Sequence, residues 1–420
     1  MTITMTSSVA SPVLTSAATA HPTALTAAPA LPDIPSILGT YKRQAPLFVR
    51  GDGVYLIDDT GARYLDLVAG IAVTSLGHND AGVMNALQES IATGLIHTSN
   101  LYRTAPGEAL AEWFVAHSFA SSVFFANSGA EANEGAFKFA RRWAGTTGHA
   151  NKREIVAVRG SFHGRMPGTL AATDRPAYRL PFGPLMGGVS IVERDLAELA
   201  TALDPETVAA VIVEPIQGEG GVRVLEPEFL RALRTLTSER QVLLILDEIQ
   251  CGLGRTGSFF AYEQLGIEPD LLTIAKPLAN GLPIGAILVN DRVARVMQPG
   301  DHGTTFGGGP MLAHVAHHVV QRLSDPALLT HVRETGAWFG EQLQGIADRT
   351  GKVRAIRGQG LMWGMDVHEP AAAIIARAFA NRVLLVSAGE YTLRFLPPLV
   401  ITKDELAPAL VTLEAAIAAG

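Results

Sequence analysis

Cysteine is almost absent from this sequence of 420 residues, which contains only Cys251. No internal disulfide can form, and a reducing cytoplasm is the expected location. Long apolar runs are also missing, because none approaches the roughly 20 residues that a membrane-spanning helix needs. Basic residues form no long run, and the net charge is −7. We therefore expect no membrane segment and no nucleic-acid partner.

Charged residues are absent from residues 1–32, which consist largely of Ala, Thr, Ser and Pro. A secretory signal has a basic start and an unbroken apolar core, and a transit peptide is rich in Arg. The segment has neither of these features, so the sequence predicts a disordered extension. An unusual targeting sequence is the alternative.

The rest of the chain has the composition of a large α/β enzyme, since 48% of all residues are apolar and 17% are charged. Short apolar runs alternate with helical patterns, and these runs occupy residues 123–126, 155–158, 209–213, 242–246, 271–275 and 285–289. Such alternation predicts a mainly parallel central sheet with helices on both faces.

The two ends of the chain have a different pattern. Residues 53–67 are typical of a β-hairpin, and strand-like segments occur at 360–367, 383–386 and 392–396. We expect an N-terminal segment at 33–85 that packs with a small domain, a large domain at 86–305, and a small α+β domain at 306–420.

Two of the apolar runs end abruptly in a polar residue. Asp247 follows Leu244–Leu246, and Lys276 follows Leu272–Ala275. Ligands of open α/β sheets bind outside the carboxyl ends of the strands. An aspartate and a lysine at neighbouring strand ends are the pair that pyridoxal-phosphate chemistry requires, one to protonate the pyridine ring and one to bind the cofactor covalently. Alone, the aspartate is equally typical of a helix cap and the lysine of a solvated side chain.

Three further loops follow predicted strands. Residues 128–130 open a helix, whose N-terminus favours a phosphate. Phe162 is suited to covering a flat ring, and Arg165 to binding a carboxylate with two hydrogen bonds. Residues 214–221 contain three glycines and two carboxylates, which suggests a loop pressed against a ligand. Each loop alone is also compatible with a cap, a core side chain or a turn. Together, the five strand ends form a complete site of nucleophile, electronic partner, anion cradle and substrate clamp.

These motifs resemble the class III (ornithine-type) pyridoxal-phosphate aminotransferases, and among them most closely the N-acetylornithine aminotransferases. The similar stretches lie in the family's order at residues 127–134, 162–165, 214–221, 247–257, 274–281 and 302–310. The resemblance implies a fold-type-I architecture, with a mainly parallel sheet and a smaller α+β domain.

The resemblance also implies how the chain binds pyridoxal 5'-phosphate. Lys276 matches the Schiff-base lysine, which also shuttles a proton, and Asp247 matches the partner of the pyridinium nitrogen. The resemblance further implies that Gln250 contacts the cofactor's phenolic oxygen and that Phe162 covers its ring face. The implied phosphate contacts are Ser128, Gly129, Ala130 and, across a dimer interface, Thr305. Sharing of Thr305 implies a homodimer with two equivalent active sites. No metal site is predicted.

Substrate recognition rests on fewer residues. Arg165 matches the arginine that binds the α-carboxylate of ornithine-like donors, and Arg394 matches the one that binds the α-carboxylate of 2-oxoglutarate or glutamate. Glu219 matches the acid that masks Arg394 while the donor is bound. Thr304 lies at a substrate-contact position beside Thr305.

Two further positions bear on the choice of amino donor. Tyr41 aligns with a tyrosine that contacts the amino end of ornithine. Ile71 stands where ornithine aminotransferases have another tyrosine, and an aliphatic residue there leaves room for an N-acyl group. The resemblance therefore favours N-acetylornithine as the donor.

The expected activity is ping-pong transamination from N-acetyl-L-ornithine to 2-oxoglutarate, in arginine biosynthesis. One alternative is the lysine-biosynthesis transaminase that acts on aminoadipate semialdehyde bound to an acidic carrier protein, and others are ornithine and 4-aminobutyrate aminotransferases. An NAD-dependent dehydrogenase would need a Gly-x-Gly-x-x-Gly motif after a strand, which is not found. A non-enzymatic binding protein is disfavoured by the intact Lys276, Asp247 and Arg394.

Overall fold

The computed structural model describes residues 36–420, so the predicted extension at 1–32 lies outside the described residues. The chain divides into two units, 1–45 and 46–420. In the first unit, the described residues 36–45 contain no helix or strand and are all exposed, Tyr41 among them. The rest of this description concerns the second unit.

The core of the second unit is a seven-stranded sheet in the order β4-β12-β11-β10-β7-β5-β6. All strands run parallel except β12, which is antiparallel to both of its neighbours. The strands are β4 (Ser122–Ala126), β5 (Glu154–Val158), β6 (Val189–Val192), β7 (Val208–Val213), β10 (Leu243–Asp247), β11 (Leu271–Ile274) and β12 (Gly285–Val289). The predicted mainly parallel α/β sheet is therefore confirmed, and β6 is the one strand of this sheet that was not predicted.

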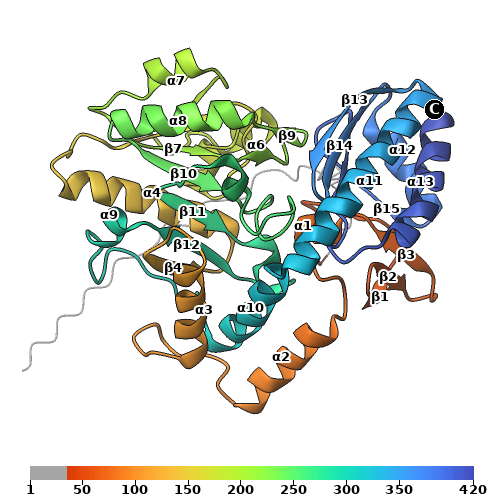
Figure 1. Ribbon diagram of the computed structural model, residues 1–420, viewed down its shortest axis with the longest axis horizontal. Helices are drawn as coiled ribbons and strands as arrows, with labels where there is room; N and C mark the ends of the chain where they lie inside the picture. The colour runs from red at the N-terminus through yellow and green to blue at the C-terminus, as the bar shows by residue number, and fades with distance from the viewer. Residues whose placement is uncertain (1–35) are drawn as a thin grey trace, which may run out of the picture. The chain divides into compact units, whose positions relative to one another are not determined.

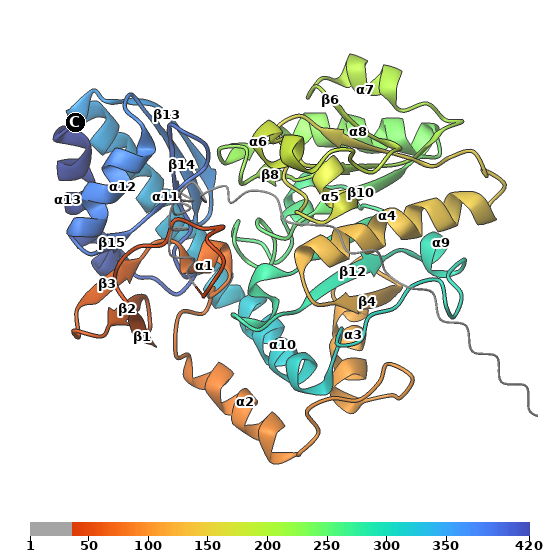
Figure 2. The same ribbon diagram turned by 180° about the vertical axis from the view of Figure 1, so that it is seen from behind.

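Apolar residues of the central strands face both ways, which explains the continuous runs in the sequence. Leu243 and Ile245 pack with the buried side of α4 (Gly129–Thr146) on one face. Leu244 and Leu246 belong to the larger cluster on the opposite face. That cluster includes residues of α3 (Ala105–Ala116), α7 (Leu196–Ala202), α8 (Pro227–Glu239) and α10 (Pro310–Leu323). Figures 1 and 2 show these two helical layers from opposite sides.

A second sheet has the order β13-β14-β17-β16 and is antiparallel. Its strands are β13 (Val353–Gln359), β14 (Met362–Val367), β16 (Val386–Ser387) and β17 (Thr392–Phe395), and it is accompanied by α11 (Pro326–Thr350), α12 (Ala371–Ala380) and α13 (Lys403–Ala418). Strand β13 was not predicted from the sequence. The predicted segment 383–386 is split, because its first two residues pair with a different sheet.

That other sheet joins the two ends of the second unit. The hairpin of β2 (Tyr55–Asp58) and β3 (Arg63–Asp66) forms as predicted, with β1 (Phe48–Asp52) beside it. Strand β15 (Val383–Leu384) then pairs in parallel with β3. Figure 1 accordingly shows the red N-terminal strands beside the blue C-terminal elements. The domain boundaries themselves stay a prediction.

Local sequence signals set the ends of the long helix α11. The Asp325 side chain accepts a hydrogen bond from the Ala327 N–H (2.9 Å), and Pro326 occupies the first turn, where its missing N–H costs nothing. The helix ends at Gly351, which has a φ of +63° and so provides the left-handed conformation that closes a helix.

The remaining helices are short or lie outside the central layers. They are α1 (Ala69–Ala72), α2 (Ala81–Ala92), α5 (Pro167–Ala171), α6 (Pro176–Arg179) and α9 (Asp291–Ala294). A small hairpin is formed by β8 (Ile216–Gln217) and β9 (Arg223–Val224). Among residues 36–420, no helix has the length and apolar character needed to cross a bilayer.

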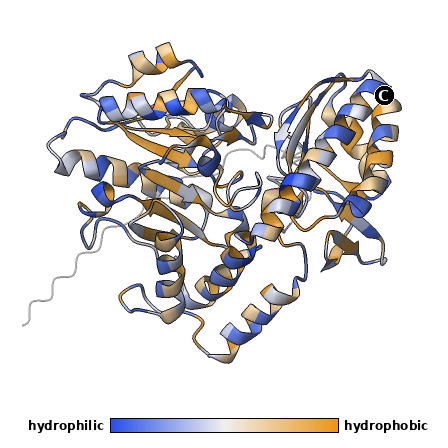
Figure 3. Cartoon of the chain, in the orientation of Figure 1, coloured by the Kyte–Doolittle hydropathy of each residue, from blue (hydrophilic) through white to orange (hydrophobic). Residues whose placement is uncertain are grey.

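Hydropathy follows the layers of the fold. Figure 3 shows apolar residues concentrated along the central strands and on the inner sides of the helices, with polar residues on the outer sides. The carboxyl end of the central sheet is different, because polar side chains gather there around a cavity. This edge contains the candidate site.

Candidate active site

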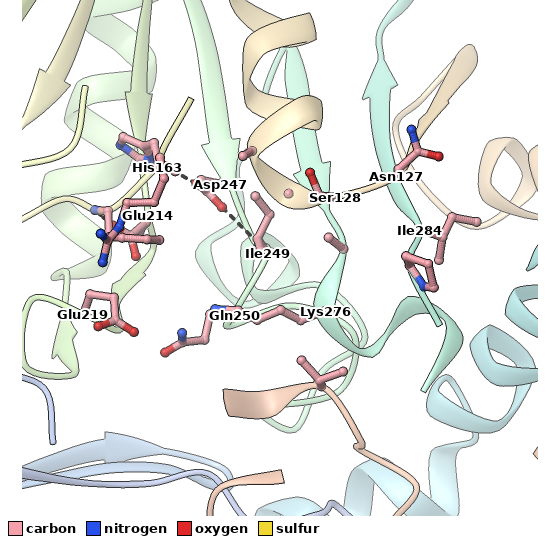
Figure 4. Close-up of a pocket in the computed structure, with 18 of the residues that line it drawn as sticks. Asn127, Ser128, His163, Glu214, Glu219, Asp247, Ile249, Gln250, Lys276 and Ile284 are labelled. Carbon is pink, nitrogen blue, oxygen red and sulfur yellow. Dashed lines mark hydrogen bonds and ion pairs between the residues drawn. The ribbon is translucent and has the colours of Figure 1, made fainter. Parts of the chain in front are cut away.

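A cavity of about 400 Å³ lies at the carboxyl ends of the central strands. It is lined by most of the residues that the sequence predicts for a site: Ser128, Gly129, Ala130, Phe162, Arg165, Glu219, Asp247, Gln250 and Lys276. Figure 4 shows side chains from several different strand ends and loops directed toward this common space. The structure therefore brings together residues that are up to 148 positions apart (276 − 128).

Asp247 is the last residue of β10 and is buried. Its Oδ2 accepts hydrogen bonds from Asn133 Nδ2 and His163 Nδ1, both at 2.8 Å. Its Oδ1 accepts one from the Ile249 N–H at 3.1 Å. Three donors on two oxygens fix the carboxylate in one orientation at the cavity wall.

Lys276 begins the short 3₁₀ turn that follows β11. Desolvation lowers the pKa of Lys276 to about 8, and the Arg394 cation acts in the same direction. The acids Glu219, Asp247 and Glu214 oppose this shift. A substantial fraction of the side chain is consequently a neutral amine near pH 8, which is the form that acts as a nucleophile and base.

The N-terminus of α4 supplies an anion-binding end to the cavity. Ser128 caps the helix, and its Oγ accepts a hydrogen bond from the Glu131 N–H at 3.2 Å. Gly129 is required by close packing, since a Cβ there would lie 2.7 Å from Ile249 Cδ1. The first N–H groups of a helix lack partners within the helix, and the helix dipole favours a negative charge beside them.

Phe162 and Arg165 lie on the loop after β5. The Phe162 N–H donates to Glu214 Oε1 at 2.8 Å, which fixes the loop beside the cavity. Burial raises the pKa of Glu214 well above its usual range, and the neighbouring Asp247 adds to the shift. The exposed Arg165 stacks on Tyr178, with its guanidinium carbon 3.4 Å from the ring centroid. It forms no ion pair with the described residues.

Arg394 comes from the second sheet and contacts two residues that line the cavity, Glu219 and Gln250. It lies on β17 and is only 2% exposed. Its Nη1 donates to Glu219 Oε1 at 2.5 Å and to Gln250 Oε1 at 3.2 Å. Burial alone would raise the pKa of Glu219, but the charge and hydrogen bond of Arg394 outweigh burial and lower it. The pair is therefore a carboxylate and a guanidinium in direct contact.

Besides Arg394, four predicted residues do not line this cavity. Thr304 accepts a hydrogen bond from Asn127 Nδ2 at 2.9 Å, which places it just outside the cavity, and Thr305 is exposed. Ile71 is half-buried in a turn where four consecutive residues have positive φ, at +68° for Ile71 itself. This is an uncommon conformation for a β-branched residue. Tyr41 belongs to the other unit.

Sequence reasoning missed three site residues that touch Asp247 or its partners: Asn133, His163 and Thr273. A signal existed for two of them. Asn133 is a polar residue on the apolar side of α4, and Thr273 interrupts the apolar strand Leu271–Ile274. A buried polar residue needs a hydrogen-bond partner, so each of these positions could have been marked. Among residues 36–420, no group of three or more His, Cys, Asp or Glu side chains is arranged to hold a metal ion.

Comparisons with known proteins agree with this geometry. Residues 40–417 match the family model of the class-III aminotransferases. The acetylornithine aminotransferase of Gloeobacter violaceus is 46% identical over 384 residues, covering 91% of this chain and 96% of the relative. That of Xanthomonas campestris is 46% identical over 389 residues, covering 91% and 95%.

Solved structures of the same kind superpose on the chain. The N-acetylornithine aminotransferase of Stenotrophomonas maltophilia has a TM-score of 0.80 and 40% identity, covering 90% of this chain and 97% of that one. The ornithine aminotransferase of Toxoplasma gondii has a TM-score of 0.87 and 31% identity, covering 91% and 93%.

Proposed function

The chain belongs to the class-III aminotransferases, and on this premise we propose that it transfers the δ-amino group of N-acetyl-L-ornithine to 2-oxoglutarate. The products are N-acetylglutamate 5-semialdehyde and glutamate, and the reaction belongs to arginine biosynthesis. Relatives named acetylornithine aminotransferase match about nine-tenths of the chain. The structural observation that supports this function is a pair of arginines: Arg165 lines the cavity without an acidic partner, and Arg394 lies behind the cavity-lining Glu219, which masks it.

The cavity suits pyridoxal 5'-phosphate, the cofactor of this family. It offers an amine at Lys276, a carboxylate at Asp247, an aromatic ring at Phe162 and a helix N-terminus at Ser128–Ala130. Gln250 provides a further hydrogen-bonding group for the cofactor's phenolic oxygen. When bound, the cofactor withdraws electrons from the substrate carbon that carries the amino group.

Lys276 holds the cofactor covalently and moves one proton. Because its pKa is lowered to about 8, the released side chain can take a proton from the δ-carbon of the donor. Nζ would hold that proton and release it again within the cavity. Asp247, whose carboxylate is fixed by three hydrogen-bond donors, would be the partner of the cofactor's ring nitrogen.

The two arginines bind the two substrates in turn. Arg165 binds the α-carboxylate of N-acetylornithine, and Glu219 stays on Arg394 so that the second cation is not presented to the donor. When 2-oxoglutarate enters, its α-carboxylate replaces Glu219 as the partner of Arg394, and its distal carboxylate binds to Arg165. The exchange suits a ping-pong reaction, since one cavity must accept substrates of different charge.

We also propose that the active enzyme is a homodimer. Thr305 is exposed and lies outside its own cavity, so it is free to reach the phosphate site of the partner subunit, with Thr304 beside the partner's substrate. Exposed apolar side chains surround this loop, and they include Leu95, Ile96, Leu101, Tyr102 and Phe306. Asn100 Nδ2 donates to the Thr304 carbonyl at 2.9 Å, so the loop and this apolar surface are contiguous. Large apolar patches of this kind commonly mark an interface.

The chain's single cysteine supports a cytoplasmic location for this enzyme. Its substrates are small molecules, and a carrier-bound aminoadipate semialdehyde is the substrate of the competing hypothesis. Ile71 is the position that we propose to favour the acetylated donor, because an aliphatic side chain there leaves room for an N-acyl group.

A single-turnover experiment separates these possibilities. The purified holoenzyme is mixed with N-acetyl-L-ornithine, L-ornithine or 4-aminobutyrate, and the loss of the bound-cofactor absorbance is followed. We expect N-acetyl-L-ornithine to react faster than the others by at least about 10-fold, the discrimination that a modest pocket contact supplies. A faster reaction with either other amine would contradict the proposed donor, and no reaction with any of the three would favour a carrier-bound substrate.

A further inference from the structure

Asn133 is the buried residue on which this inference rests. It is 0% exposed and lies on the side of α4 that faces the central sheet. Its Nδ2 donates to Asp247 Oδ2 and to the His163 carbonyl, both at 2.8 Å. Its Oδ1 accepts a hydrogen bond from Thr273 Oγ1 at 2.7 Å. Both amide hydrogens and the amide oxygen are thus used, with no contribution from solvent.

The Asp247 carboxylate and the His163 carbonyl determine which way the Asn133 amide faces, and the Thr273 hydroxyl holds the amide oxygen in that orientation. Thr273 lies on β11, directly opposite Asp247 in the register of β10 and β11. Its hydroxyl hydrogen needs an acceptor, and Asn133 Oδ1 provides one. If the amide were reversed, its oxygen would face the Asp247 carboxylate and the His163 carbonyl, which are both acceptors. The donor and acceptor pattern therefore allows one orientation only.

Asn133 links the three elements that carry the proposed cofactor contacts. Helix α4 begins with the anion cradle at Ser128, strand β10 ends in Asp247, and β11 leads from Thr273 to Lys276 three residues later. We propose that Asn133, held in place by the hydrogen bond from Thr273, is a positioning residue that fixes Asp247 relative to the anion cradle. This inference rests on the proposed function, because it concerns the carboxylate that faces the cofactor ring.

Two further donors complete the setting of Asp247. The Ile249 N–H donates to Oδ1 at 3.1 Å, and His163 Nδ1 lies 2.8 Å from Oδ2. Asn133 therefore acts with His163 and Ile249 to orient the carboxylate.

Two substitutions of Thr273 test the inference. Thr273→Val removes the hydroxyl with little change of shape, and Thr273→Ser keeps it. We expect Thr273→Val to weaken pyridoxal-phosphate binding by the cofactor-free protein and to lower kcat, each by about 10-fold, as loss of a supporting hydrogen bond commonly does. The KM for N-acetyl-L-ornithine should change by less than about 2-fold, because the substrate contacts are intact. Thr273→Ser should recover most of both losses.

Thr237 provides the matched control. It is also fully buried, and its Oγ1 donates to the Arg234 carbonyl at 2.9 Å, remote from the cavity. Thr237→Val should lower the thermal midpoint as Thr273→Val does, while cofactor affinity and kcat stay normal. Equal effects of Thr273→Val and Thr273→Ser on cofactor affinity would overturn the inference. So would a Thr273→Val protein whose only change is the thermal midpoint.

A further variant completes the test. Asn133→Leu removes the link itself and should reduce cofactor affinity by about 100-fold, the upper end for a supporting residue. Cofactor affinity is measured without an amino donor, so it remains informative even if N-acetylornithine is not the substrate.

Discussion

The cavity has two walls that hold their polar groups in different ways. The cofactor wall consists of Asp247, Asn133, His163 and Thr273, which are bonded to one another inside the sheet and beneath α4. The substrate wall consists of Arg165, Glu219 and Arg394. Its one ion pair joins a loop to another sheet, and Arg165 is exposed.

The two walls therefore suit different tasks: the cofactor wall keeps its groups fixed, and the substrate wall can exchange one anionic partner for another. Asp247 is bonded to Asn133 of α4 and to His163 and Ile249 of the adjoining loops, so nothing from solution is needed to satisfy it. On the substrate wall, Glu219 occupies a position that another carboxylate can take, because Arg394 needs an anionic partner when it is buried. A pair that can be replaced by substrate is suited to alternating substrates, whereas a closed network is suited to one permanent cofactor.

The largest expected effect comes from the lysine beside the cofactor wall. Lys276→Ala should lower turnover by at least about 10³-fold, because it removes the group that transfers the proton. The control is Lys152→Ala, since Lys152 is a buried lysine that donates to the carbonyls of Arg240 and Gln241 away from the cavity. Lys152→Ala should reduce thermal stability and retain turnover. Near-normal turnover of Lys276→Ala would contradict the assigned role.

The two arginines of the substrate wall should be distinguishable by the half-reactions that their substitutions slow. Arg394→Gln should slow only the half-reaction with 2-oxoglutarate, by about 10²-fold, as expected for loss of a charge-assisted contact to a carboxylate. Arg165→Gln should slow both half-reactions, because Arg165 binds a carboxylate of each substrate. Each half-reaction is measured separately by the change in bound-cofactor absorbance after mixing with one substrate. Equal slowing of both half-reactions by Arg394→Gln would show that Arg394 does not serve 2-oxoglutarate alone.

The strand ends were predictable from the sequence because their local pattern is strong. Asp247 and Lys276 each follow a short apolar run, and strands β10 and β11 deliver both to the same sheet edge. Arg394 has no such local signal. It lies in a different sheet, so only the resemblance to a family placed it near Glu219, and the ion pair in the structure supports that placement.

Asn133 shows why the support of the site was not predicted. It lies among Ala132, Ala136 and Ala140 on the buried side of α4, where a single polar residue does not disturb the apolar periodicity. The partner Thr273 is 140 residues away, and nothing local connects the two. Periodicity identifies which side of a helix is buried, but the pairing of buried polar atoms depends on the tertiary arrangement.

The smallest predicted effect tests whether the two walls are coupled electrostatically. Cofactor-free protein is mixed with pyridoxal phosphate, and the rate of covalent attachment is measured against pH. The pKa of Lys276 is lowered to about 8, so Nζ is mostly protonated and unreactive at lower pH. The rate should fall about 10-fold for each pH unit well below that midpoint and level off above it.

Variants of the substrate wall should move this midpoint in opposite directions. Arg394 lowers the pKa of Lys276 and Glu219 raises it. Arg394→Gln should therefore shift the midpoint to higher pH, since it removes a neighbouring cation and leaves Glu219 unpaired. Glu219→Gln should shift it to lower pH, since it removes an anion and leaves Arg394 unmasked. Because Arg394 lowers the pKa of Glu219, the acid stays ionised through this range and does not itself produce the midpoint. Shifts in the same direction would mean that the variants act on Lys276 by moving it, and the two walls would then be coupled by packing instead of by charge.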